Sequence, residues 1–268
     1  MDSKLNPVLG RRHVLELGAT SLAAIGLASC AANAGGSASD DVTGIIGAME
    51  TEVNAIKGKM DDTKVATVAG TEYCEGSIAG NKVVVVQCGM GKVNAGICAH
   101  TLINIFGVSR VINTGVGGSL TSELTINDFV VSVDAVQHDY DVSPIGFEKG
   151  EIPYTSMVAF PADESLRAKA VEAITQAAPS SKVLEGRVCS GDQFIATQEQ
   201  KDRITSEFGG ICAEMEGGAI AQVCYLNEMP YVIIRAISDD SDNMSYEEFE
   251  AEAAAECANA VLTMISGM

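Results

Sequence analysis

The sequence predicts a single three-layer α/β/α domain built on a mixed, largely parallel central sheet. From residue 42 onward, short apolar runs alternate with segments of helical period, which is typical of strand–helix–strand units. The run VVVVQC at 83–88 is dominated by valine, as expected for a strand that is covered on both faces. With 268 residues, of which 47% are apolar, the chain can bury the core of one such domain.

Six segments are predicted to be strands because they are short and rich in valine and isoleucine. The last of them is interrupted by Arg235, which in a buried strand needs either a structural partner or a place in a site. In chain order, the expected strands are 42–48, 83–88, 110–114, 129–136, 183–189 and 231–237.

Four longer segments are predicted to be helices, and another helix is expected to begin near Glu52. Pro161 is expected just before a first turn, where its missing N–H costs no hydrogen bond. Ser245 is expected to cap the last helix, ahead of two acidic residues that suit the helix dipole. In chain order, the expected long helices are 91–106, 161–178, 215–227 and 246–264.

The N-terminus is predicted to be an export signal that is not part of the folded domain. Residues 1–29 have the basic start and short apolar stretch of a signal peptide, and Arg11–Arg12 resembles a twin-arginine export signal. The sequence LASC resembles a bacterial lipobox, in which Cys30 becomes the lipid-modified first residue. Residues 30–41 then form a flexible tether, and a lipid anchor outside the cytoplasm is expected. The alternative is a short helix with a coincidental cysteine, in a cytoplasmic protein.

The composition argues against two classes of binding partner, nucleic acids and metal ions. The formal net charge is −19, and such an acidic surface repels phosphate backbones, so no nucleic-acid partner is expected. The eight cysteines lack Cys-x-x-Cys or Cys/His spacing, so no metal site is expected. Several lie in apolar runs, where buried thiols are the default.

Glycines and carboxylates dominate the segments that follow the expected strands. In layered α/β domains, ligands bind outside the carboxyl ends of the strands. The sequence GMGK at 89–92 does not match a phosphate loop, because Val93 replaces the required serine or threonine. Taken singly, Glu52 and Glu216 fit helix-capping acids as well as site residues. The segments concerned are 49–52, 89–91, 115–118, 191–194, 214–216 and 238–240.

Together these segments match a family pattern. From residue 42 to the C-terminus the chain resembles the bacterial methylthioadenosine/S-adenosylhomocysteine nucleosidases, within the purine nucleoside phosphorylase superfamily. The resemblance implies one nucleosidase domain at 42–268, a homodimer, an adenine nucleoside and water as substrates, and no cofactor or metal. It is carried by VTGIIGAMETEV, CGMGKVNAG, VINTGVGGSL, SGDQFI, AEMEGGAIA and VIIRAISDDSD.

The resemblance also implies roles for single residues. Adenine is a poor leaving group unless it is protonated, and Asp239 resembles the acid that protonates its N7 atom, with Ser238 beside it. Glu52 resembles the residue that holds and activates the water on the opposite face of the sugar. Glu216 resembles the ribose binder, with Met215 lying against the ribose.

The remaining implied residues surround the substrate. Phe194 resembles the aromatic residue that stacks on adenine, the Ile195 backbone the group that reads its edge, and Arg235 an arginine near the water and the ribose. The rest of the expected pocket is Ala48, Val116, Gly117, Gly118 and Glu214. A partner subunit is expected to complete an apolar slot for the alkylthio group through Val142, Ile145 and Pro153.

The sequence departs from the family pattern at one position of the expected site, and it leaves two alternative functions open. Many nucleosidases of this family carry serine where this chain has Val116, so a hydroxyl near the water is missing. A phosphorylase would use phosphate in place of water, but Glu50 and Glu52 in the first loop would repel it. A non-catalytic nucleoside-binding lipoprotein would have no need for both acids.

Overall fold

The computed structural model describes residues 41–239 and 245–268, with residues 239 and 245–248 described only by their place in a strand or helix. The predicted signal peptide (1–29), Cys30, and all but the last residue of the predicted tether (30–41) lie outside the described residues. Within the described part of the chain, no helix has the length and apolar character needed to cross a membrane.

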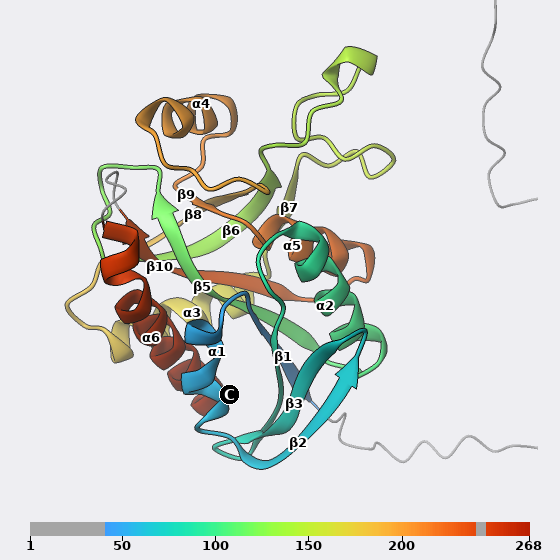
Figure 1. Ribbon diagram of the computed structural model, residues 1–268, viewed down its shortest axis with the longest axis vertical. Helices are drawn as coiled ribbons and strands as arrows, with labels where there is room; N and C mark the ends of the chain where they lie inside the picture. Colours follow the sequence, from blue (N-terminus) through green and yellow to red (C-terminus); the bar gives the residue numbers. More distant parts are fainter. Residues whose placement is uncertain (1–40, 240–244) are drawn as a thin grey trace, which may run out of the picture. The chain divides into compact units, whose positions relative to one another are not determined.

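The described strands form one mixed sheet (Figure 1). Its centre is a parallel run in the order β4-β1-β5-β10, and antiparallel strands extend it on both sides. The sheet is therefore mixed as predicted, and parallel pairs also join β6 to β8 and β8 to β9. The strands are β1 (Val42–Gly47), β2 (Asp61–Val68), β3 (Thr71–Ile78), β4 (Asn81–Gln87), β5 (Arg110–Ser119), β6 (Phe129–Gln137), β7 (Ala159–Pro161), β8 (Val183–Ser190), β9 (Cys212–Glu214) and β10 (Tyr231–Asp239).

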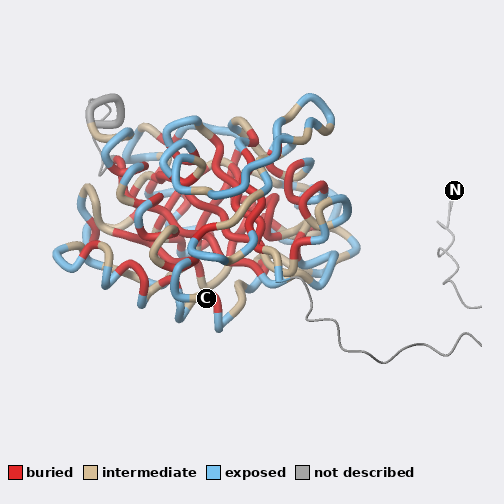
Figure 2. The backbone as a smooth tube through the Cα atoms, turned by 90° about the horizontal axis from the view of Figure 1, so that it is seen from below, coloured by how far each residue is buried: buried red, intermediate tan, exposed pale blue. Residues whose placement is uncertain are grey.

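Helices cover both faces of the sheet, which confirms the three-layer prediction. Helices α1 (Glu50–Lys57), α3 (Glu164–Ala177) and α6 (Ser245–Ser266) share one buried apolar cluster with the sheet. Helices α2 (Lys92–Asn104) and α5 (Gly217–Leu226) share a second cluster on the other face. Figure 2 shows the buried strands enclosed by exposed loops and helix surfaces. Helix α4 (Gln198–Phe208) packs on a third, smaller cluster.

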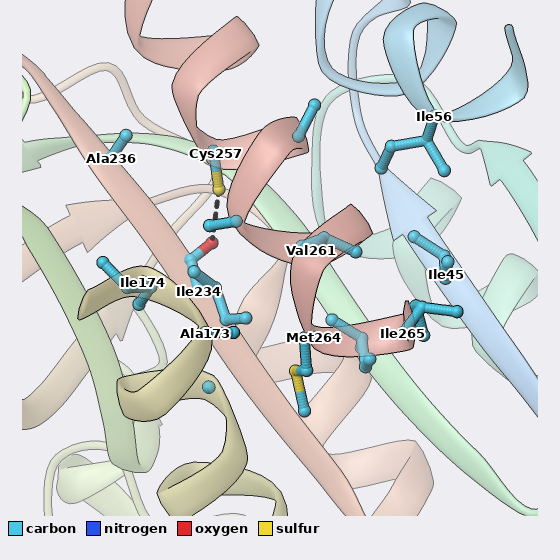
Figure 3. Packing of buried hydrophobic residues seen from close by; sticks show 14 of the residues in the cluster. Ile45, Ile56, Ala173, Ile174, Ile234, Ala236, Cys257, Val261, Met264 and Ile265 are labelled. Carbon is cyan, nitrogen blue, oxygen red and sulfur yellow. Dashed lines mark hydrogen bonds between the residues drawn. The ribbon is translucent and has the colours of Figure 1, made fainter. Parts of the chain in front are cut away.

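Helix α6 lies directly on the central strands (Figure 3). Its apolar side chains, such as Val261 and Met264, pack toward β10 and α3 and are almost fully buried. The Cys257 thiol donates a hydrogen bond to the backbone carbonyl of Ile234, at 3.6 Å. The seven cysteines of the described residues form no disulfide, and all except Cys74 are buried, as expected for core thiols.

The prediction for Pro161 is wrong in detail. Pro161 is the last residue of strand β7, and helix α3 begins three residues later behind the N-cap Asp163, whose side chain accepts from the Leu166 N–H. Edge strands tolerate proline because one row of their N–H groups needs no partner. Ser245, predicted as an N-cap, is already the first residue of α6.

The strand pairings also place the ends of three strands together. β5, β9, β8, β6 and β10 pair in a closed circuit, because β10 pairs with β5 as well as with β6. Gly118 on β5 pairs with Ala213 on β9 and with Asp239 at the end of β10. The carboxyl end of β10 and the acid-rich segment after β9 therefore flank the same point of β5.

Candidate active site

A pocket that is partly open to solvent lies at the carboxyl ends of these strands. Its empty volume is about 630 Å³ when the open space at its mouth is included. The lining comes from β5, β9 and β10, from the segments that follow β1, β4, β8 and β9, and from helices α1 and α4. It consists of Ala48, Met49, Glu52, Met90, Val116, Gly117, Gly118, Gln193, Phe194, Ile195, Lys201, Ala213, Glu214, Met215, Glu216 and Ser238.

Most of the residues predicted for the site meet in this pocket. Eleven of them line it, from Ala48 after β1 to Ser238 on β10. Arg235 does not line it and lies behind the wall. Asp239 is the last residue of β10, next to Ser238, and its side chain lies outside the described part of the structure. The roles implied for these residues remain predictions.

Glu52 is held in a fixed orientation at the pocket wall. Its Oε2 atom accepts from the N–H groups of Ala48 and Met49 at 2.5 and 2.9 Å, and its Oε1 atom from that of Val116 at 3.1 Å. A β-carbon at Gly115 would lie 2.4 Å from Glu52 Oε1, so only glycine leaves room for this carboxylate. Burial raises the pKa of Glu52, against the opposing effects of Arg235 and the three N–H groups. Oε2 therefore accepts from two backbone N–H groups and Oε1 from one, which leaves one lone pair of Oε1 available to a ligand or water.

The sequence left open whether Arg235 pairs structurally or lines a site. The structure shows that it pairs with buried carboxylates. It is 1% exposed, and its Nη2 donates to Glu214 Oε2 at 2.5 Å and to Asn113 Oδ1 at 2.6 Å. Glu214 also accepts from the N–H groups of Glu216 and Gly217, and from the Ser190 hydroxyl. Breaking such a buried pair costs about 3–5 kcal/mol, so Arg235 and Glu214 fix the strand ends that carry the site.

Glu216 is a buried carboxylate that ionises near neutral pH. Its Oε1 atom accepts from the Gly91 N–H at 2.8 Å, and its Oε2 atom lies 3.9 Å from Arg235 Nη2. Burial, followed by the neighbouring charge of Glu214, raises the pKa of Glu216 to about 7. Three carboxylates around one guanidinium leave this region with an excess of negative charge, which suits a ligand that donates hydrogen bonds or gains positive charge.

We expect this pKa to appear in the pH dependence of substrate affinity. The family resemblance implies that Glu216 accepts from the ribose hydroxyls, which a carboxylate does better than a carboxylic acid, so KM should rise as the pH falls through about 7. Initial rates measured at several nucleoside concentrations between about pH 5.5 and 8.5 test this. Glu216→Gln cannot ionise and should show a high KM that is flat near pH 7; a wild-type KM that is constant across the range would contradict the assignment.

Two neighbouring apolar residues of the loop after β8 also line the pocket. Phe194 is 51% exposed at the rim, and Ile195 is buried. The Ser238 hydroxyl is buried and has no hydrogen-bond partner among the described residues, so it can bond to a ligand. Lys201 of α4 also lines the pocket, although the sequence analysis did not select it.

The segment predicted for the partner subunit's slot lies apart from this pocket. Val142, Ile145 and Pro153 belong to the long connection between β6 and β7, which Figure 1 shows projecting away from the sheet. None of the three lines the pocket, and Ile145 is 74% exposed. They therefore contribute nothing to the pocket of their own chain.

Among the described residues, no group of three or more His, Cys, Asp or Glu side chains is placed to hold a metal ion. The carboxylates of the pocket instead bond to backbone N–H groups and to Arg235.

Comparisons with known proteins agree with this geometry. The model of the phosphorylase superfamily matches residues 42–266, and the chain belongs to this superfamily. A 5'-methylthioadenosine/S-adenosylhomocysteine nucleosidase of Staphylococcus carnosus is 38% identical over 84% of this chain and 99% of its own length. Within the superfamily, the chain belongs to the 5'-methylthioadenosine/S-adenosylhomocysteine nucleosidase family.

Solved structures give the same assignment. The nucleosidase of Colwellia psychrerythraea 34H, in complex with adenine, is 36% identical, with a TM-score of 0.80 over 84% of this chain and 94% of that one. The nucleosidase of Neisseria meningitidis, in complex with methylthio-immucillin-A, is 34% identical, with a TM-score of 0.81 over 85% of this chain and all of that one. The predicted fold class and family are thereby confirmed.

Proposed function

We propose that the protein hydrolyses the N-glycosidic bond of 5'-methylthioadenosine and S-adenosylhomocysteine, releasing adenine and the thioribose. The observation that carries this proposal is the placement of Glu52, a buried carboxylate held by three N–H groups in the wall of a pocket that also contains Glu216 and Ser238. Ser238, which precedes Asp239 at the end of β10, lines the same pocket. Incubation of the purified domain with either nucleoside, followed by chromatography for free adenine, tests it.

The proposed chemistry divides the work between two acids. Asp239 donates a proton to N7 of adenine, so that the base leaves as a neutral molecule while positive charge develops on the sugar. Glu52 accepts a proton from the water that attacks the anomeric carbon. Glu216 accepts from the ribose hydroxyls, and the excess negative charge around Arg235 favours the cationic sugar more than the neutral substrate.

Phosphate is a poor alternative to water in this pocket. Glu52, Glu214 and Glu216 all line the pocket, and Arg235 already pairs with Glu214. A phosphate dianion there would be repelled. Adenine release should therefore be equal with and without added phosphate, and release that depends on phosphate would identify a phosphorylase. A nucleoside-binding protein without activity would bind the nucleosides and release no adenine.

Replacing Val116 with serine is expected to raise turnover. Val116 lines the pocket, and its N–H already bonds to Glu52, so a serine would keep that bond and add a hydroxyl that can hold the water. We expect kcat to rise by about two- to tenfold with little change in KM. Val116→Ala is the matched control, since it removes the same apolar bulk without adding a hydroxyl. Equal rates for the two variants would show that the missing hydroxyl is unimportant.

We further propose that the chain acts as a homodimer. Exposed apolar side chains occur three to four residues apart just before and within the start of α2, at Met90, Val93 and Ile97. The projecting connection between β6 and β7 also exposes Ile145 and Tyr154. An exposed apolar surface of this kind favours association. A second copy would bring its Val142, Ile145 and Pro153 to the alkylthio end of the pocket. Sedimentation velocity tests this proposal, and a monomer at assay concentrations would contradict it.

We also propose that the mature protein is a lipid-anchored, extracytoplasmic lipoprotein. This proposal rests on the sequence LASC that ends at Cys30, and on the basic residues and the apolar run that precede it. Membrane association of the full-length chain, lost in a Cys30→Ser variant, is the expected result. A cytoplasmic, full-length product would show that the N-terminus is not a signal.

A further inference from the structure

Two segments that form the rim of the pocket are tied together by three charged residues. Met90 and Phe194 both line the pocket and are 60% and 51% exposed, so each belongs to its rim. Met90 precedes α2, and Phe194 follows β8. Neither segment is part of a strand or helix where it meets the pocket, so something else must fix the distance between them.

Lys92, Asp139 and Asp192 form a closed ring of hydrogen bonds, which we call the rim clasp. The Lys92 N–H donates to Asp192 Oδ1 at 2.8 Å. The Asp192 N–H donates to Asp139 Oδ2 at 2.9 Å, and the Lys92 ammonium donates to Asp139 Oδ1 at 2.6 Å. Each residue comes from a different segment and bonds to both of the others. The clasp therefore joins the start of α2, the end of β6 and the loop after β8.

Two features show that the clasp is built closely around its segments. Gly91 has a φ of +97°, and a β-carbon there would lie 3.0 Å from Asp192 Oδ1, so the position favours glycine. Burial alone would raise the pKa of Asp139, but the Lys92 ammonium and the Asp192 N–H outweigh it and hold that pKa below its ordinary value. The Lys92 ammonium also donates to Gln137, which bonds in turn to Gln222 of α5.

The clasp is also continuous with the proposed ribose binder. Consecutive peptide N–H groups point to two different carboxylates, that of Gly91 to Glu216 and that of Lys92 to Asp192. A shift of the start of α2 would therefore move Met90 and loosen Glu216 together. We propose that Asp139 and Asp192 are positioning residues that, through Lys92, set the spacing of Met90 and Phe194 and so determine how tightly the purine nucleoside is held.

This inference rests on the proposed function for its substrate, but its test does not require turnover. Asp192→Ala removes the acceptor for the Lys92 N–H at an exposed position, so the variant should fold. We expect KM for methylthioadenosine and the calorimetric Kd for free adenine each to rise about tenfold, while kcat changes less than about twofold. Asp192→Asn keeps an acceptor oxygen and should restore most of the affinity.

Two further variants separate the clasp from a general loss of charge or stability. Asp202→Ala, on the exposed face of α4, makes the same change in charge and should leave KM and Kd unchanged. Asp139→Ala should weaken binding about as much as Asp192→Ala, and the double variant no more than either, because either change opens the ring. Values for Asp192→Ala within about twofold of wild type, or multiplicative losses in the double variant, would overturn the proposal. If the wild type releases no adenine, the proposed function fails while the adenine Kd still tests the clasp.

Discussion

Glu52→Gln is expected to lower kcat by about 10² to 10⁴-fold, the range for loss of a positioned acid or base. The amide cannot take a proton from water. Its NH₂ group must also face either the Val116 N–H or the paired N–H groups of Ala48 and Met49, because all three now donate to the carboxylate. Donor facing donor in a buried wall adds a stability cost of about 1–3 kcal/mol. Steady-state kinetics and thermal unfolding measure the two effects.

Glu50→Gln is the matched control for this variant. Glu50 lies two residues earlier on α1, is exposed, and bonds only to the Asn54 side chain among the described residues. The same substitution there should leave turnover and stability nearly unchanged. If Glu52→Gln turned over substrate at close to the wild-type rate, Glu52 would have no part in activating water.

Asp239→Asn is the second change with a large expected effect, also about 10² to 10⁴-fold in kcat. Asparagine can form hydrogen bonds, but it has no proton to transfer to the departing adenine. Nucleoside affinity should be largely retained, since the loss falls on the transition state and not on the bound substrate. Adenine release and nucleoside binding, measured separately, give the two quantities.

A change of leaving group distinguishes the roles of the two acids. A 4-nitrophenyl thioriboside releases an anion that needs no proton, so Asp239→Asn should hydrolyse it at close to the wild-type rate. Glu52→Gln should fail with this substrate as well, because water must still be activated. Equal losses for Asp239→Asn on both substrates would exclude it as the acid that protonates the leaving group.

The elements that form the centre of the fold could be predicted because their sequence patterns are strong. The valine run of β4 and the apolar period of α2 predicted those elements to within about two residues at most of their ends. The hairpin of β2 and β3 was missed because β2 is largely exposed and has no alternation of apolar residues. Helix α4 was missed because it is mostly polar, although Thr197 and Gln200 form a capping box that marks its start.

The site was predicted to the extent that it follows strand ends. Residues just past β1 and β8 line the pocket as expected, because parallel strands bring such segments to one edge. Residues 115–118 were expected to follow a strand that ends at 114, but they belong to β5, which continues to Ser119. Lys201 could not be found in this way, since it reaches the pocket from a helix that the sequence analysis had missed. The rim clasp was also missed, because its bonds pass between backbone and side chains of residues far apart in the sequence.

The cysteines of the core have a consequence for a protein proposed to work outside the cytoplasm. Burial raises the pKa of Cys189 and Cys224 to about 12, so almost none of either thiol is in the reactive thiolate form at neutral pH. No disulfide crosslinks the described residues, and six of their seven cysteines are shielded from oxidants. No disulfide therefore contributes to the stability of the described domain, which should be the same in an oxidising compartment as in a reducing one.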